Sequence, residues 1–327
     1  MKVLVYTNWP VTFWLVPKSQ VDRLRRQFPG VTFTHVEDDA DALAEIADAD
    51  VALASRLTPQ MVRQGGRLRW VHSPAAAVSI LPLSDLAARG VLVSNSRGVQ
   101  ATTMAEHVMG GLLMIVRRLD ATFWAQRERR WIQNELASSD WPETLAGKSM
   151  TIVGLGTTGI EVARRAHAFG MRVTGVRRHP ERPKPAFVDR VVGADELDAA
   201  LRGCDVLVIC APALAETDRL IGRDRIALLN RGAIMANVAR GQIVDERAMI
   251  DALHAGQLGG AVLDVFEHEP LDPSSPLWTL PHVVVTPHSS GVRPSHWDDV
   301  IDFFAENLRR FQTGGALLNL IDCQAGY

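Results

Sequence analysis

Short runs of apolar residues alternate along the chain with longer stretches whose apolar positions recur at helical spacing. In the first third, the runs predict strands at Lys2–Tyr6, Val31–His35, Val51–Ala54, Arg69–His72 and Val91–Ser94. A second, more uniformly apolar set predicts strands at Met150–Val153, Arg172–Val176, Val206–Cys210, Ala233–Val238, Ala261–Val265 and Val283–Thr286. Runs that are apolar on both faces are typical of parallel strands covered by helices on each side. The alternation therefore predicts an α/β fold with parallel sheets.

A long helical pattern follows each set of strands. The first covers Thr102–Leu119 and is rich in Ala, Met and Leu. The second starts at a Ser295–Asp298 pair that resembles a capping box and ends at Gly314–Gly315. The apolar tail at Leu317–Ile321 then needs a core to cover it, and the first set of strands is the candidate. We therefore expect two domains, one formed by residues 1–100 plus 292–327 and the other by 101–291, with hinge helices near 101–119 and 294–311.

The segment after the first long helix, residues 120–147, is charged but also carries Trp124, Trp131 and Trp141. A solvated arm is the simpler interpretation of the charges. Tryptophan is enriched at subunit interfaces, so a contact between two copies of the chain is the alternative.

Composition narrows the class of protein. A chain of 327 residues is long enough for about two domains. The formal net charge is −2, which argues against a dedicated nucleic-acid binder. The apolar stretch Val108–Val116 has nine residues, whereas a membrane span needs about 20. The three cysteines fit no zinc spacing, and the N-terminus shows no signal-peptide pattern. We expect a cytoplasmic protein without a metal.

The strongest local motif is a glycine-rich turn between a strand and a helix. Gly154, Gly156 and Gly159 follow Met150–Val153 as G-x-G-x-x-G, and a second strand at Arg172–Val176 closes a βαβ unit. In this context, the glycines permit a tight turn, close approach of the backbone to a pyrophosphate, and close packing of the helix on the strand. An ordinary glycine turn is much less favoured. The motif predicts a dinucleotide site.

The end of the second strand indicates which dinucleotide. An acidic residue about 20 positions after the motif would bond the ribose hydroxyls of NAD, but Arg177 and Arg178 stand there. A guanidinium can bind a 2′-phosphate through two hydrogen bonds. We therefore expect NADP(H) in preference to NAD(H), the alternative being that both arginines form a solvated strand end.

Three further strand ends are followed by residues with charged or acid–base side chains. Arg240, Glu269 and His288 each follow a predicted strand, and ligands of doubly wound sheets gather beyond the carboxyl ends of the strands. Each residue alone could be a loop charge, a turn acid or a structural histidine. Together, behind one dinucleotide motif, they favour hydride transfer to a carbonyl.

The sequence resembles the D-isomer-specific 2-hydroxyacid dehydrogenases, a family that includes glyoxylate/hydroxypyruvate reductases. The resemblance covers nearly the whole chain and rests on SNSRGVQATTMAEHV, LAGKSMTIVGLGTTGI, NVARGQIVDE, DVFEHEPLDPSSPLW and TPHSSG. It implies two Rossmann-like doubly wound domains. It also implies that the cofactor domain is inserted into a substrate domain built from both chain ends, and that the protein is a homodimer.

The resemblance also implies roles for single residues. Arg240 matches the arginine that holds the substrate carboxylate and carbonyl, His288 the acid/base at the C2 oxygen, and Glu269 the acid that favours protonated histidine. Substrate contacts are expected from Arg240, His288 and the loop Ala76, Ala77 and Val78. Cofactor contacts are expected from Thr103, Gly154, Gly156, Thr157, Thr158, Gly159, Arg177, Arg178, Cys210, Pro212, Thr217, Val238, Ala239, Arg240, Asp264, His288 and Ser290.

Two positions depart from the family pattern in the substrate loop. Ala77 and Ser79 stand where glycine and an acid are common, and Ala77 restricts φ. Cys210 stands where many members have histidine. The favoured function is NADPH-dependent reduction of a small 2-ketoacid to a D-2-hydroxyacid, an enzyme acting on the CH–OH group of donors. The alternatives are a non-catalytic dinucleotide sensor that binds a partner, and a dehydrogenase for another acceptor such as phosphonate.

Overall fold

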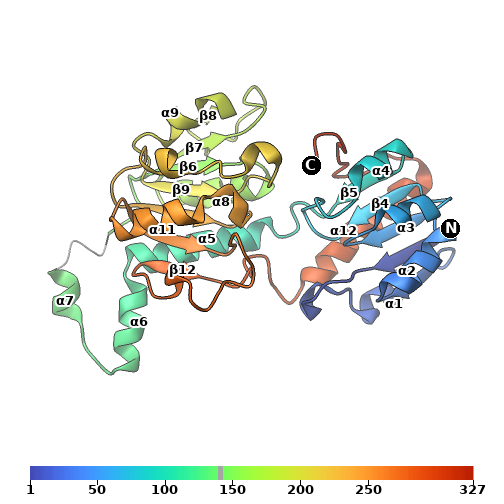
Figure 1. Ribbon diagram of the computed structural model, residues 1–327, viewed down its shortest axis with the longest axis horizontal. Helices are drawn as coiled ribbons and strands as arrows, with labels where there is room; N and C mark the ends of the chain where they lie inside the picture. The colour runs from blue at the N-terminus through green and yellow to red at the C-terminus, as the bar shows by residue number, and fades with distance from the viewer. Residues whose placement is uncertain (139–142, 327) are drawn as a thin grey trace. The chain divides into compact units, whose positions relative to one another are not determined.

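The computed structural model describes residues 1–138 and 143–326, so Trp141 lies outside the described residues. The chain forms two compact units (Figure 1). Unit 1 consists of Met1–Val99 and Arg293–Tyr327, and unit 2 consists of Gln100–Val292. The prediction of two parallel α/β units, one inserted into the other, is confirmed.

Unit 1 is built on a five-stranded parallel sheet with strand order β2–β1–β3–β4–β5. The alternation of side chains along β1 explains its two-sided core. Val3 and Val5 face the layer that contains α1 and α12, whereas Leu4 and Tyr6 face the layer that contains α2–α4. The strands are β1 (Lys2–Tyr6), β2 (Thr32–Val36), β3 (Val51–Ala54), β4 (Trp70–Ser73) and β5 (Leu92–Asn95). The helices are α1 (Lys18–Gln27), α2 (Asp39–Glu45), α3 (Pro59–Gln64), α4 (Leu83–Ala88) and α12 (His296–Thr313).

The C-terminal tail completes unit 1. Ile321 is buried in the same core as Leu4 and Tyr6, and its amide donates to the Val93 carbonyl at 2.8 Å. The apolar tail thus lies against β5, next to an antiparallel bridge between Ser94 and Leu320.

Unit 2 is built on a seven-stranded parallel sheet with strand order β12–β11–β10–β9–β6–β7–β8. The strands run outward from β6 in both directions, so the connection reverses between β6 and β9. Ligands of such sheets bind beyond the carboxyl ends at this reversal. The strands are β6 (Ser149–Val153), β7 (Arg172–Val176), β8 (Arg190–Val192), β9 (Val206–Ile209), β10 (Ala233–Asn237), β11 (Leu258–Leu263) and β12 (Val283–Val285).

Helices cover both faces of this sheet (Figure 1). Residues of α5 and α8 share one buried core, and residues of α9–α11 share the other. The helices are α5 (Ala101–Val116), α6 (Leu119–Arg127), α7 (Gln133–Ala137), α8 (Thr157–Ala168), α9 (Leu197–Leu201), α10 (Arg223–Ile226) and α11 (Glu246–His254). The short 3-10 helices are η1 (Thr12–Trp14), η2 (Ile46–Asp48), η3 (Ala194–Glu196), η4 (Ala215–Thr217), η5 (Gly241–Ile243) and η6 (Pro276–Trp278).

The structure corrects two local predictions and adds one strand that the sequence did not predict. The helix expected at Thr102–Leu119 ends at Val116, because Arg118 adopts a left-handed conformation with φ 55° and α6 starts after it. Ser295 precedes α12 but caps no backbone N–H; its hydroxyl instead donates to Asp299 Oδ2 at 3.3 Å. The edge strand β8 has only three residues, one of them Arg190, and shows no apolar run that predicts it.

Candidate active site

The glycine turn after β6 lies at the reversal point of the sheet of unit 2. Gly154 has φ +98°, and a Cβ there would lie 2.5 Å from the Ala211 backbone nitrogen, in the loop after β9. A Cβ on Gly159 would lie 2.3 Å from the Gly154 carbonyl oxygen. These two positions therefore require glycine for packing and conformation. A Cβ on Gly156, in contrast, would meet nothing within 4 Å.

The first turn of α8 faces the same open space. Gly156 is its N-cap residue and offers no side chain to cap the helix, and both Gly156 and Thr157 are exposed. The N–H groups of the first turn have no carbonyl partner within a helix, and the helix dipole favours an anion there. An exposed glycine, an uncapped twelve-residue helix and a tight turn together fit the pyrophosphate of a dinucleotide.

Arg177 and Arg178 follow β7 directly and lie beside this turn. The Arg177 guanidinium donates to the backbone carbonyls of Arg182 and Pro183, while its Nε is buried and has no hydrogen-bond partner. Arg178 pairs with Glu216, which belongs to η4 after β9. The two arginines thus border the carboxyl edge of β7, and one of them links it to the loop after β9.

The other predicted cofactor residues occupy the same edge or α5. Pro212 and Thr217 are joined by a 2.8 Å hydrogen bond from the Thr217 hydroxyl to the Pro212 carbonyl. Val238 and Ala239 are buried after β10, and Thr103 lies half-buried in the first turn of α5. Cys210 packs against the core, and burial raises the pKa of its thiol to about 12. That thiol stays protonated at neutral pH.

Glu269 and His288 form the central pair of the site. His288 Nδ1 lies 2.7 Å from Glu269 Oε2, although 19 residues separate them in the chain. The other carboxylate oxygen, Oε1, accepts from the Phe266 amide at 3.1 Å. Since both carboxylate oxygens are engaged, the orientation of the carboxylate is held from two sides. The imidazole then keeps Nε2 for a second partner.

Arg240 belongs to the turn between β10 and η5. A Cβ on the next residue, Gly241, would lie 1.9 Å from the Phe266 carbonyl carbon, so glycine lets this turn pack on the loop that leads to Glu269. Asn237 Nδ2 donates to the Arg240 carbonyl at 3.0 Å and helps to hold the turn. The Arg240 side chain is half-buried, with Nη1 donating to the Ala239 carbonyl at 2.6 Å.

Charges couple the three residues. Burial lowers the pKa of the Arg240 guanidinium, and the negative charge of Glu269 acts in the opposite direction. Burial also opposes ionisation of Glu269, but the hydrogen bond and charge of His288, the Phe266 amide and the charge of Arg240 outweigh it. The pKa of the Glu269 carboxyl is therefore lower than usual.

Asp264 orients the backbone that carries His288. Its Oδ1 accepts from the Ser289 amide at 2.8 Å and from the Thr286 hydroxyl at 2.7 Å, and its Oδ2 accepts from the Ser290 amide at 3.0 Å. His288 has φ 51°, which is uncommon for a residue other than glycine, and its amide donates to the Asp264 carbonyl at 2.9 Å. The fully buried Asp264 carboxylate is thus directed onto the loop at 286–290.

Two residues of this network, Thr286 and His107, were not identified from the sequence. Thr286 Oγ1 lies 3.1 Å from His107 Nε2 on α5. Because the Thr286 hydroxyl donates to Asp264, His107 must be the donor to Thr286. The only available signal was that both residues fall within motifs that carry the family resemblance, at AEHV and TPHSSG.

The predicted substrate loop lies in unit 1, directly after β4. Ala75 and Ala76 are exposed, and Ala77 is half-buried. Ala77 is absent from the non-glycine residues with positive φ in the described chain. Its methyl group is therefore accommodated without a left-handed backbone conformation.

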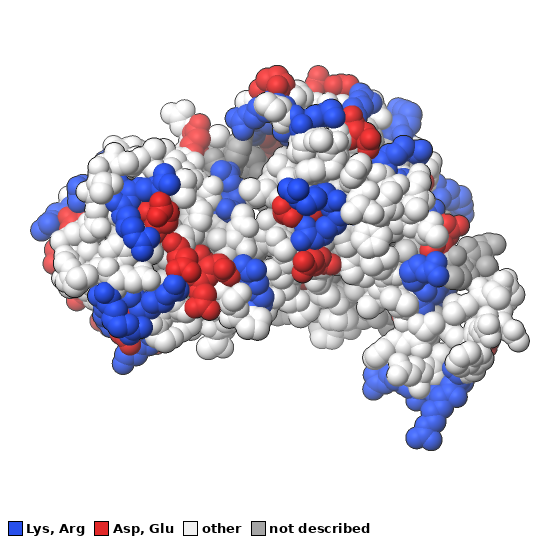
Figure 2. All heavy atoms as spheres, turned by 180° about the vertical axis from the view of Figure 1, so that it is seen from behind, with Lys and Arg blue, Asp and Glu red and all other residues white. Residues whose placement is uncertain are grey.

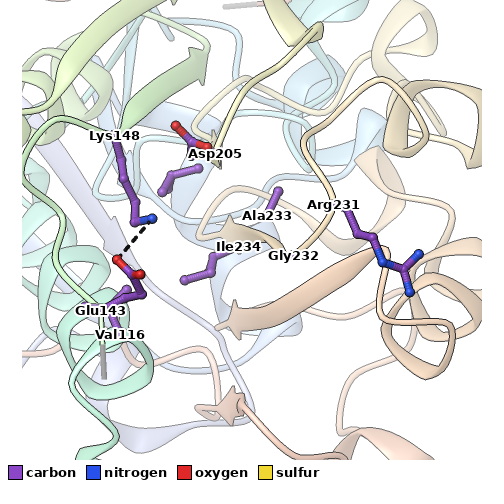
Figure 3. A pocket seen from close by; sticks show the side chains of 9 residues that line it. Val116, Glu143, Lys148, Asp205, Arg231, Gly232, Ala233 and Ile234 are labelled. Atoms are coloured by element: carbon purple, nitrogen blue, oxygen red, sulfur yellow. Dashed lines mark ion pairs between the residues drawn. The ribbon is translucent and has the colours of Figure 1, made fainter. Parts of the chain in front are cut away.

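A cavity of unit 2 that is lined by charges of both signs lies away from these residues (Figure 3). It has a volume of about 230 Å³ and is lined by residues at the amino ends of β9 and β10, with Glu143 and Lys148 3.5 Å apart. The chemistry described above lies at the opposite, carboxyl edge of the strands.

On the face drawn in Figure 2, basic and acidic side chains lie interspersed. Within residues 1–138 and 143–326, no helix is both long and apolar enough to cross a membrane. The same residues contain no group of three or more His, Cys, Asp or Glu placed to hold a metal ion.

Comparison with known proteins gives one consistent family. The family model for the D-isomer specific 2-hydroxyacid dehydrogenase NAD-binding domain matches residues 109–290. The glyoxylate reductase of Korarchaeum cryptofilum is 31% identical over 287 residues, which cover 87% of this chain and 83% of that protein. A glyoxylate/hydroxypyruvate reductase B from Klebsiella pneumoniae is 33% identical over 287 residues, covering 85% of this chain and 87% of that protein.

A solved structure shares the architecture over the full length. It is an NADPH-dependent glyoxylate/hydroxypyruvate reductase from Sinorhizobium meliloti in complex with NADP and sulfate. The TM-score is 0.82 at 26% identity, and the match covers 100% of both chains.

Proposed function

Because the chain belongs to the D-isomer specific 2-hydroxyacid dehydrogenases, oxidoreductases that act on the CH–OH group of their donors, we propose that it reduces small 2-ketoacids to D-2-hydroxyacids with NADPH. Glyoxylate and hydroxypyruvate are the substrates of first choice, since relatives are named for them. The observation that carries the proposal is the 2.7 Å contact between His288 and Glu269, in the same unit and at the same sheet edge as the glycine turn.

Each residue has a defined part in the proposed reaction. Bound NADPH supplies the hydride for C2 of the ketoacid. Arg240 offers a planar fork that holds the carboxylate and the adjacent carbonyl oxygen. Because Glu269 engages Nδ1 of His288, Nε2 is the nitrogen that donates a proton to the C2 oxygen. Glu269 stays ionised and holds the imidazolium in place, and acid–base groups of this kind contribute about 10²–10⁴-fold to the rate.

The turn after β6, α8 and the residues after β7 would hold the cofactor. Gly154, Gly156 and the α8 amides would bind the pyrophosphate, and Arg177 with Arg178 would bind a 2′-phosphate. The related structure from Sinorhizobium meliloti, which contains NADP, supports NADP(H) in preference to NAD(H). The free thiols Cys204, Cys210 and Cys323 are compatible with the reducing, cytoplasmic setting that we also propose.

The test is oxidation of NADPH, followed at its absorbance band, with ketoacids of graded side-chain size. We expect turnover of glyoxylate and hydroxypyruvate and poor turnover of aldehydes without a carboxylate. The product from hydroxypyruvate, which has a stereocentre at C2, should be the D enantiomer by chiral chromatography. His288→Ala should bind NADPH normally and lose most of the turnover. An L or racemic product, or NADPH binding without turnover of any ketoacid, would overturn the proposal and favour a dinucleotide sensor or another acceptor.

We further propose that the chain is a homodimer through α6 and α7. We call residues 119–137, which contain α6 and α7, the arm. In the arm, Leu119, Phe123, Trp124 and Trp131 are exposed, and the exposed fraction of Trp131 is 87%. Monomers rarely leave large apolar groups clustered in water. Sedimentation should give about twice the chain mass of 35.9 kDa. Trp124→Arg and Trp131→Arg should shift it toward the monomer, whereas Trp278→Arg outside the arm should not.

A further inference from the structure

Three hydrogen-bond donors contact consecutive backbone carbonyls of the loop after β4. Asn95 Nδ2 donates to the Ala76 carbonyl at 2.5 Å, and the Ser73 hydroxyl donates to the Ala77 carbonyl at 3.3 Å. The Ser96 amide donates to the Ala75 carbonyl at 3.3 Å. Ser73, Asn95 and Ser96 lie at the adjoining carboxyl ends of β4 and β5. Three consecutive carbonyls are thus directed toward one place inside unit 1.

Because the peptide bond is planar, the direction of these carbonyls also fixes the direction of the N–H groups in the same peptide units. In a trans peptide the N–H points opposite to the C=O of the same group. The peptide groups whose carbonyls belong to Ala75, Ala76 and Ala77 carry the N–H groups of Ala76, Ala77 and Val78. Those N–H groups must point away from Ser73 and Asn95. Since Ala75 and Ala76 are exposed, the three amides face outward beside an exposed part of the loop.

The residues that supply the three donors lie in the buried interior of unit 1. Ser73, Asn95 and Ser96 are all buried. His72, fully buried on β4, contacts Ser94 Oγ through Nδ1 at 2.8 Å and Ser96 Oγ through Nε2 at 3.0 Å. Its ring stacks on Phe303 of α12. Little freedom remains for the strand ends that hold the loop.

We propose that Ser73 and Asn95 are positioning residues that orient the amides of Ala76, Ala77 and Val78 to bind the carboxylate of the ketoacid. The inference rests on the proposed function and assigns new roles to two residues that touch neither substrate nor cofactor. It also explains how alanine can occupy position 77. Orientation of the amides comes from carbonyl tethers and not from a glycine conformation.

Substitutions that remove the donors test the positioning role. Asn95→Asp keeps the acceptor that serves the Arg97 amide but cannot donate to the Ala76 carbonyl. Ser73→Ala removes the hydroxyl donor, and Ser73→Thr keeps it. We expect Asn95→Asp and Ser73→Ala to raise KM for glyoxylate at least about tenfold, with KM for NADPH within twofold, and Ser73→Thr to restore KM.

Asn307→Asp is the matched control. Asn307 is also buried in unit 1 and donates to a backbone carbonyl, that of Leu318 at 3.0 Å, away from the loop. Asn307→Asp therefore also removes a donor from a buried asparagine, but it leaves the hydrogen bonds to the loop after β4 in place. If Asn307→Asp raises KM for glyoxylate as much as Asn95→Asp does, the positioning role is wrong.

A second readout does not require turnover. In protein labelled with ¹⁵N-alanine, oxamate should shift the amide resonances of Ala76 and Ala77 in the unmodified protein and in Asn307→Asp, but not in Asn95→Asp. Failure of the proposed function would appear as no turnover of any ketoacid. Failure of this inference would appear as no oxamate shift in the unmodified protein, or as an unchanged shift and KM in Asn95→Asp.

Discussion

Oε2 of Glu269 lies 2.7 Å from Nδ1 of His288, while Oε1 of the same carboxylate is held by the Phe266 amide. The carboxylate therefore fixes the ring orientation and leaves Nε2 as the reactive nitrogen. The pKa of Glu269 is lowered, so the carboxylate remains ionised well below neutral pH.

Glu269→Gln should lower the rate of reduction and change its pH dependence. The glutamate holds the His288 ring as a carboxylate, and its pKa is lower than usual, so in the unmodified protein this contact is lost only as the pH falls through that lowered pKa. Glutamine does not ionise, so we expect kcat/KM for glyoxylate to be lower and to lack this loss at acidic pH, with KM for NADPH little changed. A profile that superimposes on that of the unmodified protein would assign Glu269 to structure alone.

Arg177→Asp should reverse or erase the preference for NADPH. An aspartate repels the 2′-phosphate, and loss of a charge-assisted contact costs about 1.5–3 kcal/mol in kcat/KM. Arg182→Asp makes the same charge change in the same loop, where Arg182 contributes its backbone carbonyl to Arg177, and should alter the preference much less. Equal kcat/KM for NADPH and NADH in the unmodified protein would contradict the assignment.

Thr286→Val should slow catalysis without weakening cofactor binding. The valine cannot donate to Asp264 or accept from His107, so the buried Asp264 carboxylate loses the Thr286 hydroxyl and keeps the Ser289 and Ser290 amides. Because this carboxylate holds the backbone around His288, kcat should fall by roughly tenfold. Thr286→Ser retains the hydroxyl and should keep most of the activity. A normal kcat in Thr286→Val would show that Asp264 holds the loop without it.

His72 should make unit 1 sensitive to acid. Burial lowers its pKa to about 3, whereas an unfolded histidine titrates near ~6.5. The folded state thus binds fewer protons between these values. The stability from this group is complete above pH ~6.5 and falls by about 1.4 kcal/mol per pH unit toward pH 3.

His72→Gln should remove this contribution. We expect the free energy of unfolding, measured by urea titration, to fall between pH 6.5 and pH 5 in both proteins. The fall in His72→Gln should be smaller than that in the unmodified protein by about 2 kcal/mol. His254→Gln, which removes an exposed histidine, should leave the loss unchanged. An equal pH dependence in His72→Gln and the unmodified protein would be evidence against neutral His72 in the fold.

Local patterns in the sequence determined the elements whose signal is short-range. Apolar runs such as Val206–Cys210 correspond to β9. The glycine turn with its following helix is also visible, because Gly154 has a positive φ and Gly159 packs against the Gly154 carbonyl. The family and the two-unit parallel α/β fold followed from such motifs in combination. Their physical basis is that strand, turn and helix preferences depend mainly on neighbouring residues.

Only the tertiary structure decided the relationships that depend on distant residues. The resemblance implied that Glu269 supports His288, but the use of Nδ1 at 2.7 Å depends on the packing of separate segments. The same holds for the use of both Asp264 oxygens by the loop at 286–290 and for the hydrogen bonds of Asn95 and Ser73 to the loop after β4. Sequence spacing does not specify such contacts, because hydrogen-bond direction depends on the register and packing of neighbouring strands. The break after Val116 and the short edge strand β8 were likewise decided by backbone conformation and pairing with β7, and not by a periodic pattern.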